Sequence, residues 1–295
     1  MAPPPRRPRP SSEPCTPVVA YSVVVGHEAM KGGILDLETE AADRRPGAPN
    51  PQAPPLIVAG LSHAFGERQA LRDVSFEVNR GDRTMLLGLN GAGKTTLFSL
   101  ITRLYNHRSG SIRIFGWEIK KKPSEALARL GVVFQLPTLD PDLSVAQNLF
   151  YHAALHGLPR REAAARIKRE IERVGLTERM HEKARTLSGG QRRRVEIARA
   201  LIHQPKMLLL DEATVGLDIA SRQFLLDHVR MLCREEGLAV LWATHLIDEV
   251  DSAANVIVLH RGRILAQGPV PDVILQANAA SIREAFDKLT GERGE

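Results

Sequence analysis

The sequence predicts an α/β fold in which a mostly parallel sheet is covered on both faces and is interrupted by an all-helical insertion. Short apolar runs recur with helical segments between them, a pattern typical of buried parallel strands. Such runs lie at 84–89, 112–115, 131–134, 207–210, 239–243 and 256–259. Between 144 and 185 they stop, and the segments 145–156 and 160–174 have the periodicity of helices instead.

The first 55 residues differ from the rest in composition. They hold 12 of the 19 prolines, which fix φ and lack a backbone donor. We therefore expect 1–55 to be a disordered extension, and a start of translation at Met30 or later is an alternative. The body of the chain opens with an alternating strand at 74–78 and a helix at 94–102.

The overall composition excludes several classes of protein. The chain has 295 residues, of which 43% are hydrophobic and 25% charged, and none of its apolar runs reaches the roughly 18 residues that span a bilayer. We therefore expect neither an integral membrane protein nor, with only two cysteines, a disulfide scaffold. The net charge of +6 is compatible with nucleic acid, phosphate ligands or an anionic membrane surface, and it does not choose among them.

A glycine-rich segment joins the run at 84–89 to the helix at 94–102. It fits the phosphate-loop pattern G-x-x-x-x-G-K-[ST] in the required context of strand, turn and helix. The loop amides and the helix N-terminus bind phosphate, Lys94 reaches the β- and γ-phosphates, and the Thr95 hydroxyl coordinates Mg²⁺. The predicted nucleotide contacts are Gly88, Leu89, Asn90, Gly91, Ala92, Gly93, Lys94, Thr95 and Thr96.

Two acidic residues follow the apolar run at 207–210. In a parallel sheet this places their carboxylates at the carboxyl edge, beside the phosphate loop. Asp211 is predicted to hold Mg²⁺ through water, and Glu212 to polarise the water that attacks the γ-phosphate. Solvated acids at the end of a core strand are the alternative, which the preceding phosphate loop disfavours.

Leu187 to Gln191 reads LSGGQ, and on this motif the chain resembles the ATP-binding-cassette (ABC) ATPases from Leu56 to about Gly268. The resemblance implies a P-loop cassette with an antiparallel β subdomain. It assigns 56–270 to the cassette, about 136–186 to its helical insertion and 271–295 to a C-terminal helical tail. Two departures are an alanine, Ala213, where the family usually has proline, and Phe65 where tyrosine is more frequent.

The resemblance also implies roles for individual residues. Phe65 would stack on adenine. Gln135 would take part in catalysis and would also bind the metal, together with Thr95 and Asp211. His245 would contact the γ-phosphate and the attacking water. Glu212, His245, Lys94 and Gln135 are the expected catalytic residues. The residues expected to complete the ATP site are Ser188, Gly189, Gly190, Gln191 and Asp218.

The same family likeness implies the function and the partners. Two cassettes, identical or related, would pair head to tail with ATP and Mg²⁺ between them and would drive a separate integral membrane permease from the cytoplasmic face of the inner membrane. The segment 136–149 would contact the permease. Export is favoured over import, the substrate is not readable, and no nucleic-acid partner is expected because Arg192–Arg194 fits the polar stretch of the signature helix.

Two alternative functions come from other classes. A DNA-repair or chromosomal ABC ATPase usually has a long coiled-coil or zinc insertion, whereas Lys94 and Ser188 are only 94 residues apart. A regulatory nucleotide-binding module would more naturally lack Glu212. Among transport cassettes, the segments 134–140, 144–149, 151–157, 193–201 and 241–245 look similar to the proteins associated with PQQ-dependent alcohol catabolism.

Overall fold

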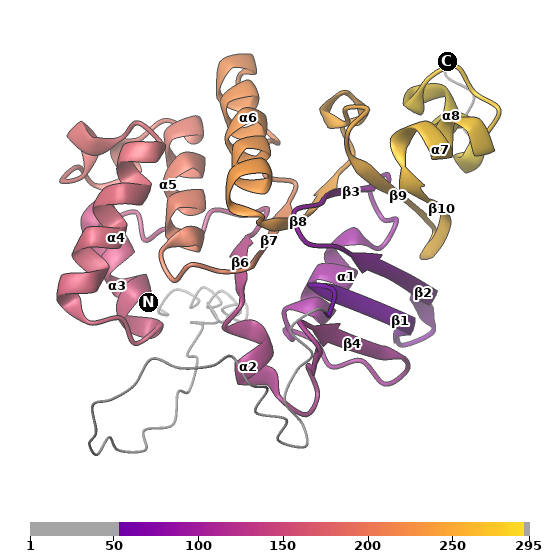
Figure 1. Ribbon diagram of the computed structural model, residues 1–295, viewed down its shortest axis with the longest axis horizontal. Helices are drawn as coiled ribbons and strands as arrows, with labels where there is room; N and C mark the ends of the chain where they lie inside the picture. The colour runs from indigo at the N-terminus through magenta and orange to yellow at the C-terminus, as the bar shows by residue number, and fades with distance from the viewer. Residues whose placement is uncertain (1–52, 292–295) are drawn as a thin grey trace, which may run out of the picture.

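The computed structural model describes residues 53–291, so the extension expected at 1–55 lies almost wholly outside the described residues. The main sheet contains β3 (Arg83–Leu87), β6 (Leu130–Val133), β7 (Met207–Asp211), β8 (Ala239–Thr244), β9 (Asn255–His260) and β10 (Arg263–Pro269). Within the described chain these six strands lie in the order β10-β9-β3-β8-β7-β6. All neighbours are parallel except β10, which runs antiparallel to β9. The predicted mostly parallel sheet is therefore confirmed (Figure 1).

A smaller antiparallel sheet packs beside the main one. It contains β1 (Leu56–Phe65), β2 (Arg68–Val78), β4 (Ser111–Ile114) and β5 (Trp117–Glu118) in the order β2-β1-β4-β5. The first of these strands has no clean alternation because its register against β2 shifts at several places between Val58 and Ala64. These irregularities explain why sequence periodicity located only parts of this sheet.

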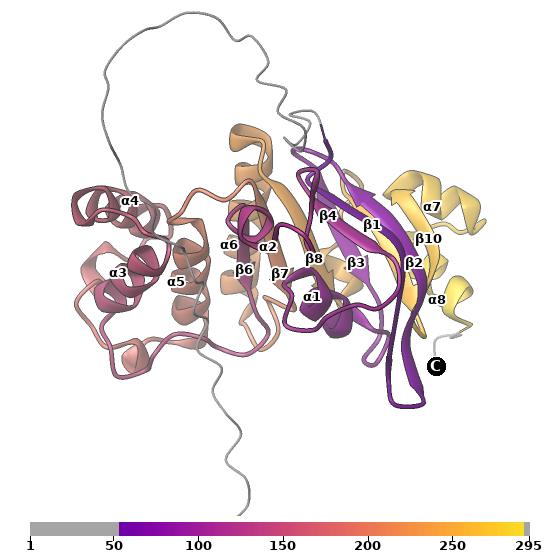
Figure 2. The same ribbon diagram turned by 90° about the horizontal axis from the view of Figure 1, so that it is seen from below.

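Helix α1 (Lys94–Ile101) lies between the two sheets (Figure 2). Its residues Leu97 and Phe98 are buried in one cluster with β-strand residues such as Leu61 and Leu241. This burial fixes the N-terminus of the helix directly behind the loop that leaves β3. The short helix α2 (Pro123–Leu127) adds Ala126 to the same cluster.

The opposite face of the main sheet is covered by four helices of the described chain. These are α5 (Gly189–Leu201), α6 (Ile219–Glu236), α7 (Val270–Gln276) and α8 (Ile282–Thr290). Their apolar residues form a second cluster with the sheet, in which Trp242 of β8 is fully buried. Helices α7 and α8 lie within the predicted C-terminal tail and pack over β10 (Figure 1).

The predicted helical insertion contains α3 (Val145–Leu155) and α4 (Arg160–Arg173), with 3-10 turns at Thr177–Arg179 and Ala184–Thr186. Ser144 and Gln147 form a capping box that starts α3, since each side chain bonds the other's backbone amide. The insertion has its own apolar cluster, which also includes the inner face of α5. These helices extend away from the antiparallel sheet (Figure 1).

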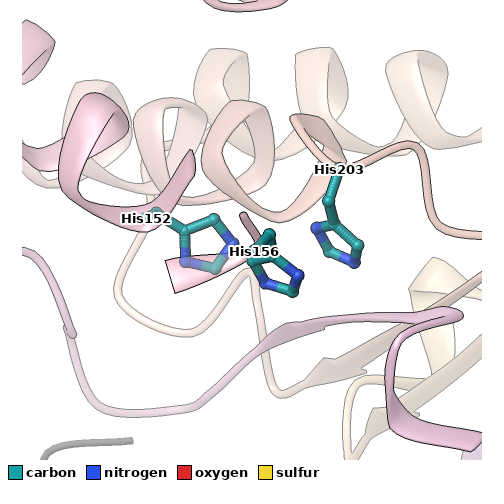
Figure 3. A group of neighbouring side chains, drawn as sticks. All are labelled: His152, His156 and His203. Carbon is teal, nitrogen blue, oxygen red and sulfur yellow. The ribbon is translucent and has the colours of Figure 1, made fainter. Parts of the chain in front are cut away.

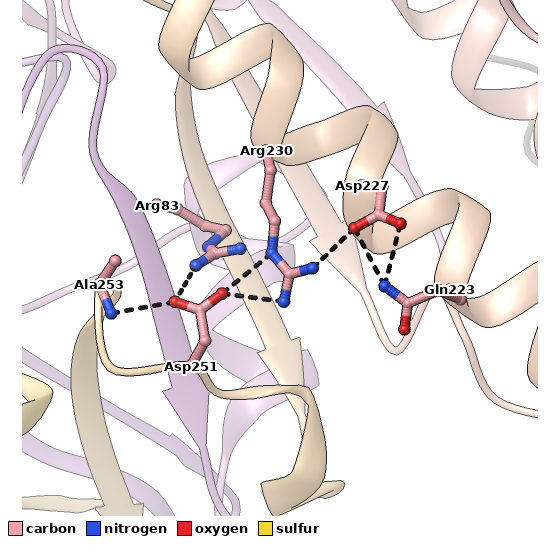
Figure 4. A network of polar contacts seen from close by, with 6 residues as sticks. All are labelled: Arg83, Gln223, Asp227, Arg230, Asp251 and Ala253. Atoms are coloured by element: carbon pink, nitrogen blue, oxygen red, sulfur yellow. Dashed lines mark hydrogen bonds and ion pairs between the residues drawn. The ribbon is translucent and has the colours of Figure 1, made fainter.

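A partly buried ion-pair network ties α6 to the main sheet. The Asp251 carboxylate, just after the 3-10 turn Ile247–Glu249, accepts hydrogen bonds from Arg83 of β3 and Arg230 of α6 (Figure 4). The Arg83 side chain is 8% exposed, so its charge depends on this partner. None of the helices between residues 53 and 291 combines the length and the apolar character needed to cross a bilayer.

Candidate active site

The phosphate loop occupies the gap between the end of β3 and the start of α1, as predicted. Gly93 has φ 114°, and a Cβ atom there would lie 2.8 Å from the Leu71 side chain and 2.9 Å from the Ala70 carbonyl oxygen. A side chain at this position would therefore meet both strain and collision. A Cβ at Gly91, in contrast, would meet no atom within 4 Å, so this part of the loop backbone is open to a ligand.

The Lys94 ammonium lies inside this loop. It donates to the carbonyl oxygens of Gly88 at 2.6 Å and Leu89 at 3.2 Å, and it forms an ion pair with Glu212 at 3.1 Å. Its side chain is only 4% exposed. A buried cation held by two carbonyl oxygens and one carboxylate is well placed to bind phosphate oxygens at the same point.

Glu212 is the centre of a compact group of polar side chains. Its Oε2 accepts a hydrogen bond from Gln135 Nε2 at 3.2 Å and lies 3.4 Å from His245 Nδ1. The residue has φ 47°, a left-handed conformation that is uncommon outside glycine and is frequent at functional sites. The structure thus brings together Lys94, Gln135, Glu212 and His245, the expected catalytic set.

Asp211 precedes Glu212 at the end of β7 and has a different environment. Its Oδ1 is buried and has no hydrogen-bond partner among the described residues. Burial, together with the neighbouring Glu212 charge, raises the pKa of Asp211 to about 6, although Lys94 and Arg193 oppose the shift. An unpartnered buried carboxylate oxygen beside a phosphate loop fits a ligand of Mg²⁺ or of a water bound to it.

A pocket of about 640 Å³ opens over the loop. Among the predicted site residues its walls include Phe65, Asn90, Gly91, Gly93, Lys94, Thr95, Thr96, Gln135 and Glu212. Phe65 is 46% exposed and packs edge-on against Tyr105, with ring centroids 5.5 Å apart. An exposed aromatic ring at the mouth of a cationic pocket suits a flat base joined to phosphates.

Sequence reasoning missed four polar lining residues, Arg68, Gln69, Arg72 and Arg261. The first three belong to β2, which returns directly after Phe65, and Arg261 lies in the turn between β9 and β10. The closeness of Arg68 and Arg72 to Phe65 in sequence was an available signal. For Arg261 there was none, because only the sheet order brings its turn beside the loop.

The residues of the LSGGQ motif and Asp218 lie outside this pocket. Ser188 caps α5, and Ser188 and Gln191 each bond the other's backbone amide. Asp218 caps α6 and accepts from Ser221. Ser188–Gln191 and Asp218 do not line the pocket that contains Lys94, so within one chain the structure does not bring them to the phosphate loop.

A phosphate loop at the end of one central parallel strand and an acid at the end of another define a P-loop nucleotide hydrolase. Residues 71–215 match the family described as "ABC transporter". A solved structure titled "Structure of ATP binding subunit of ABC transporter" aligns with a TM-score of 0.73 and 29% identity, covering 80% of this chain and 99% of that one. The P-loop cassette fold is thereby confirmed.

Curated relatives agree with this match. The linearmycin resistance ATP-binding protein LnrL of Bacillus subtilis is 37% identical over 240 residues, 78% of this chain and 77% of the relative. The Nod factor export ATP-binding protein I of Ralstonia nicotianae is 34% identical over 245 residues, 83% and 76% of the two chains. The methionine import ATP-binding protein MetN of Brucella abortus is 36% identical over 249 residues, 83% and 68% of the two chains.

The chain belongs to the ABC transporter family and is an ATP-binding subunit with transport-coupled ATPase activity. The family resemblance on the LSGGQ motif is therefore confirmed, and the relatives favour a transport subunit over the DNA-repair alternative. The narrower resemblance to proteins of PQQ-dependent alcohol catabolism stays a prediction. Relatives named for export and for import both match, so the family alone gives no direction of transport.

Proposed function

We propose that this chain hydrolyses ATP at a site shared by two cassettes and thereby drives a separate membrane permease, with export as the direction. The observation that carries the proposal is the grouping of Lys94, Gln135 and His245 around Glu212, beside the open phosphate loop. Catalysis of phosphoryl transfer is mostly positioning and electrostatics, and this group provides both.

Each member of the group has a task at the reacting phosphate. Glu212 orients and polarises the attacking water, because its two carboxylate oxygens face different partners and one can turn to water when Lys94 engages phosphate. Lys94 compensates the charge that develops on the γ-phosphate. His245 directly follows β8, is 30% exposed and lies beside Glu212, from where it would contact the water and the γ-phosphate. Gln135 keeps the carboxylate of Glu212 in position through its amide.

The metal site in this proposal contains Asp211, Thr95 and Gln135. Mg²⁺ prefers oxygen ligands and keeps several waters, so a few oxygens at the loop edge suffice. The unpartnered Oδ1 of Asp211 supports this assignment. When bound, Mg²⁺ would neutralise charge on the β- and γ-phosphate oxygens.

The remaining nucleotide contacts follow from the lining of the pocket. The Phe65 ring offers a stacking face for adenine, and the loop residues along the pocket offer their amides to the phosphates, namely Asn90, Gly91, Gly93, Lys94, Thr95 and Thr96. The amides of Gly88 and Ala92 donate instead to the carbonyl oxygens of Thr244 and Leu89. Arg68, Arg72 and Arg261 add positive charge along the same wall, which favours a triphosphate over a neutral ligand.

A second cassette is needed because the expected contacts Ser188–Gln191 and Asp218 do not line this pocket. Ser188, Gly189 and Gly190 present a helix N-terminus, an arrangement that binds anions, on another surface of the chain. Head-to-tail pairing of two copies, or of this chain with a related cassette, brings that surface to the partner's phosphate loop. Asp218, which caps the neighbouring helix α6, then lies at the junction of the two sites.

The permease contact is assigned to the segment 136–149. Leu136 directly follows Gln135 and is 75% exposed, and Tyr151 on α3 is 60% exposed. Two large apolar side chains open to solvent, one next to Gln135 and one just beyond the segment on α3, suit a short amphipathic helix from a membrane partner, and this contact would hold the chain at the cytoplasmic face of the membrane. Because relatives named for export and for import both match, the export direction rests on the resemblance read from the sequence and not on these relatives.

A role in binding nucleic acid is not part of the proposal. The three arginines of the signature helix are engaged within the chain. Arg193 donates to the carbonyl oxygens of Phe134 and Gln135, Arg192 donates to the Leu187 carbonyl oxygen, and Arg194 stacks on the Phe224 ring at 3.7 Å.

Replacing Glu212 tests the proposed chemistry. Glu212→Gln keeps the shape of the site but removes the base, so phosphate release should slow by about 10²–10⁴-fold. Binding of Mg-ATP should persist, and the variant should elute as an ATP-dependent dimer in gel filtration. Glu235→Gln, an exposed carboxylate at the far end of α6, is the matched control and should be unchanged. Undiminished turnover in Glu212→Gln would disprove the assignment.

A further inference from the structure

A cluster of three histidines lies outside the proposed nucleotide site. His152 lies in the last turn of α3 and His156 caps the C-terminus of this helix, so the two are four residues apart and on the same side. His203 follows the C-terminal end of α5. Figure 3 shows the three imidazoles gathered between these two elements, and one nitrogen from each lies within 4.8 Å of the others.

The geometry points to a transition-metal site, with Zn²⁺ as the metal, formed by His152, His156 and His203. Imidazole nitrogen is a common zinc ligand, and three protein ligands leave a fourth position for a small ligand. Zn–N bonds of about 2.0–2.1 Å place tetrahedral ligand nitrogens about 3.4 Å apart. His156 and His203 stack face to face, with ring centroids 3.9 Å and ring planes 8° apart, so one of these rings has to turn about its side-chain bonds before both nitrogens can face one metal ion.

The hydrogen-bonding state of the rings favours a metal over simple packing. His203 Nε2 lies 2.9 Å from the Leu130 carbonyl oxygen, so this nitrogen carries the proton and Nδ1 has the free lone pair. His203 Nδ1 and His152 Nε2 are both buried without a hydrogen-bond partner among the described residues. Buried unpaired nitrogens are costly, and a shared metal ion would satisfy both.

The hydrogen bond of His203 also resembles the outer contacts of known metal ligands. A ligating imidazole usually donates its other N–H to a carbonyl or carboxylate, which fixes the ring and raises its basicity. Burial lowers the pKa of His152 to about 2 and that of His203 to about 4. It also lowers the pKa of His156.

The charged neighbours of the cluster indicate the charge of the fourth metal ligand. Arg199 lies close enough to His152, and Arg166 close enough to His203, to influence their protonation. Arg166 is paired with Glu162, whereas Arg199 donates to the backbone and side-chain oxygens of Thr138. Because a guanidinium repels a dication, an anion such as chloride or hydroxide is the fourth ligand that these surroundings favour.

The bound metal would join two parts of the cassette. Helix α3 belongs to the apolar cluster of the helical insertion, whereas His203 is bonded to the first residue of β6 in the main sheet. Zinc between them would clamp the end of α3 to the sheet and restrict movement of the insertion against it. Zinc binding would thus make the cassette more rigid when zinc is available.

Zinc titration of the full-length protein tests the site. After chelator treatment, in excess Mg²⁺ and without nucleotide, the wild-type protein should bind one Zn²⁺ per chain in calorimetry. His156→Gln should weaken this binding by at least about 100-fold, since loss of even an outer-shell contact costs 10–100-fold. His181→Gln, an exposed histidine in the same insertion, is the matched control and should bind like the wild type. Equal zinc affinity in His156→Gln and the wild type would overturn the site.

Two further measurements do not depend on the folding of a variant. Zinc at 100 times its Kd should raise the Tm of the wild-type protein by about 5–10 °C. X-ray absorption of the zinc-loaded wild type should show three imidazole nitrogens around the metal. Zinc that does not raise the Tm, or that is bound by fewer than three imidazoles, contradicts the site.

Discussion

The two acids at the end of β7 occupy opposite environments although they are adjacent in sequence. Glu212 is surrounded by Lys94, Gln135 and His245, whereas Asp211 Oδ1 has no partner within the described residues. The protein therefore keeps one buried carboxylate unsatisfied at a place where a metal-binding oxygen is useful. Such an arrangement exchanges stability for function.

The buried Asp211 carboxylate predicts how the free energy of unfolding depends on pH. The folded pKa of Asp211, about 6, lies above its ordinary value of 3.8, so the folded state holds the proton more tightly. Stability is therefore lost as pH rises from about 4 to about 6, and the loss stays complete above that range. Asp211→Asn should raise the free energy of unfolding by about 3 kcal/mol at pH 7, but by only about 1 kcal/mol at pH 4.5.

Urea unfolding without nucleotide or Mg²⁺ measures both values. Asp227→Asn is a suitable control, because this exposed carboxylate is bonded to Gln223 and Arg230 and has a lowered pKa. It should not gain stability at pH 7. A fall in the stability of Asp211→Asn at pH 7 would contradict the electrostatic account of this residue.

At the scale of residues, short sequence motifs could be located from the sequence. Clusters that form only when distant segments pack together could not. The structure groups Lys94, Gln135 and His245 around Glu212, while their catalytic roles stay a prediction. The histidine cluster was not predicted, although His152 and His156 are spaced four apart on a helix. His203 lies 47 residues beyond His156, and only the packing of α3 against α5 brings them together.

At the scale of elements, the N-termini of α5 and α6 meet at a glycine. A Cβ atom on Gly190 would lie 2.2 Å from Ser221 Oγ and 2.8 Å from Ser221 Cβ. A Cβ on the neighbouring Gly189 would meet nothing within 4 Å. The signature helix therefore needs glycine at position 190 for packing and has steric freedom at position 189.

This contrast makes a matched pair of variants. Gly190→Ala should lower the free energy of unfolding by roughly 1–3 kcal/mol through overpacking. Gly189→Ala should be neutral or stabilising by up to about 1 kcal/mol, because alanine favours the helix. Urea unfolding of both proteins provides the comparison. If the two variants lost the same stability, backbone flexibility and not contact with Ser221 would be the reason for glycine 190.

Elements with regular periodicity were located well, and irregular ones were not. Predicted runs such as 207–210 and 239–243 correspond to β7 and β8, and 160–174 corresponds to α4 within one residue at its end. Strand β1 and the two-residue β5 gave no usable pattern. Register shifts break the alternation of β1, and β5 is too short to have one.

At the scale of the whole molecule, the separation of Ser188 from the pocket predicts that one chain is not a complete enzyme. Ser188→Arg should abolish hydrolysis while ATP binding to the isolated chain stays nearly unchanged, because the cation blocks pairing without touching the phosphate loop. Ser281→Arg, which also replaces a helix-capping serine, is the matched control and should keep its activity. Full turnover by Ser188→Arg as a dilute monomer would contradict the shared site.

A truncation tests the proposed division of the chain. A protein that begins at Ala53 should fold and hydrolyse ATP at nearly the rate of the full chain, because its first strand starts at the buried Leu56. The Pro55 carbonyl oxygen, which accepts from the Phe115 amide, is retained in this protein. Circular dichroism and phosphate release are the measurements. Loss of folding would mean that the first 52 residues pack on the cassette.

The ion pair between Lys94 and Glu212 has a consequence for the order of events. In the proposed mechanism Lys94 holds phosphate and Glu212 serves as the base, and the ion pair between them occupies both groups before nucleotide enters. A triphosphate entering the loop competes with Glu212 for the ammonium, and success in that competition frees the carboxylate for water. In this proposal the Glu212 carboxylate becomes free to act on water only when the triphosphate that it helps to hydrolyse has bound Lys94.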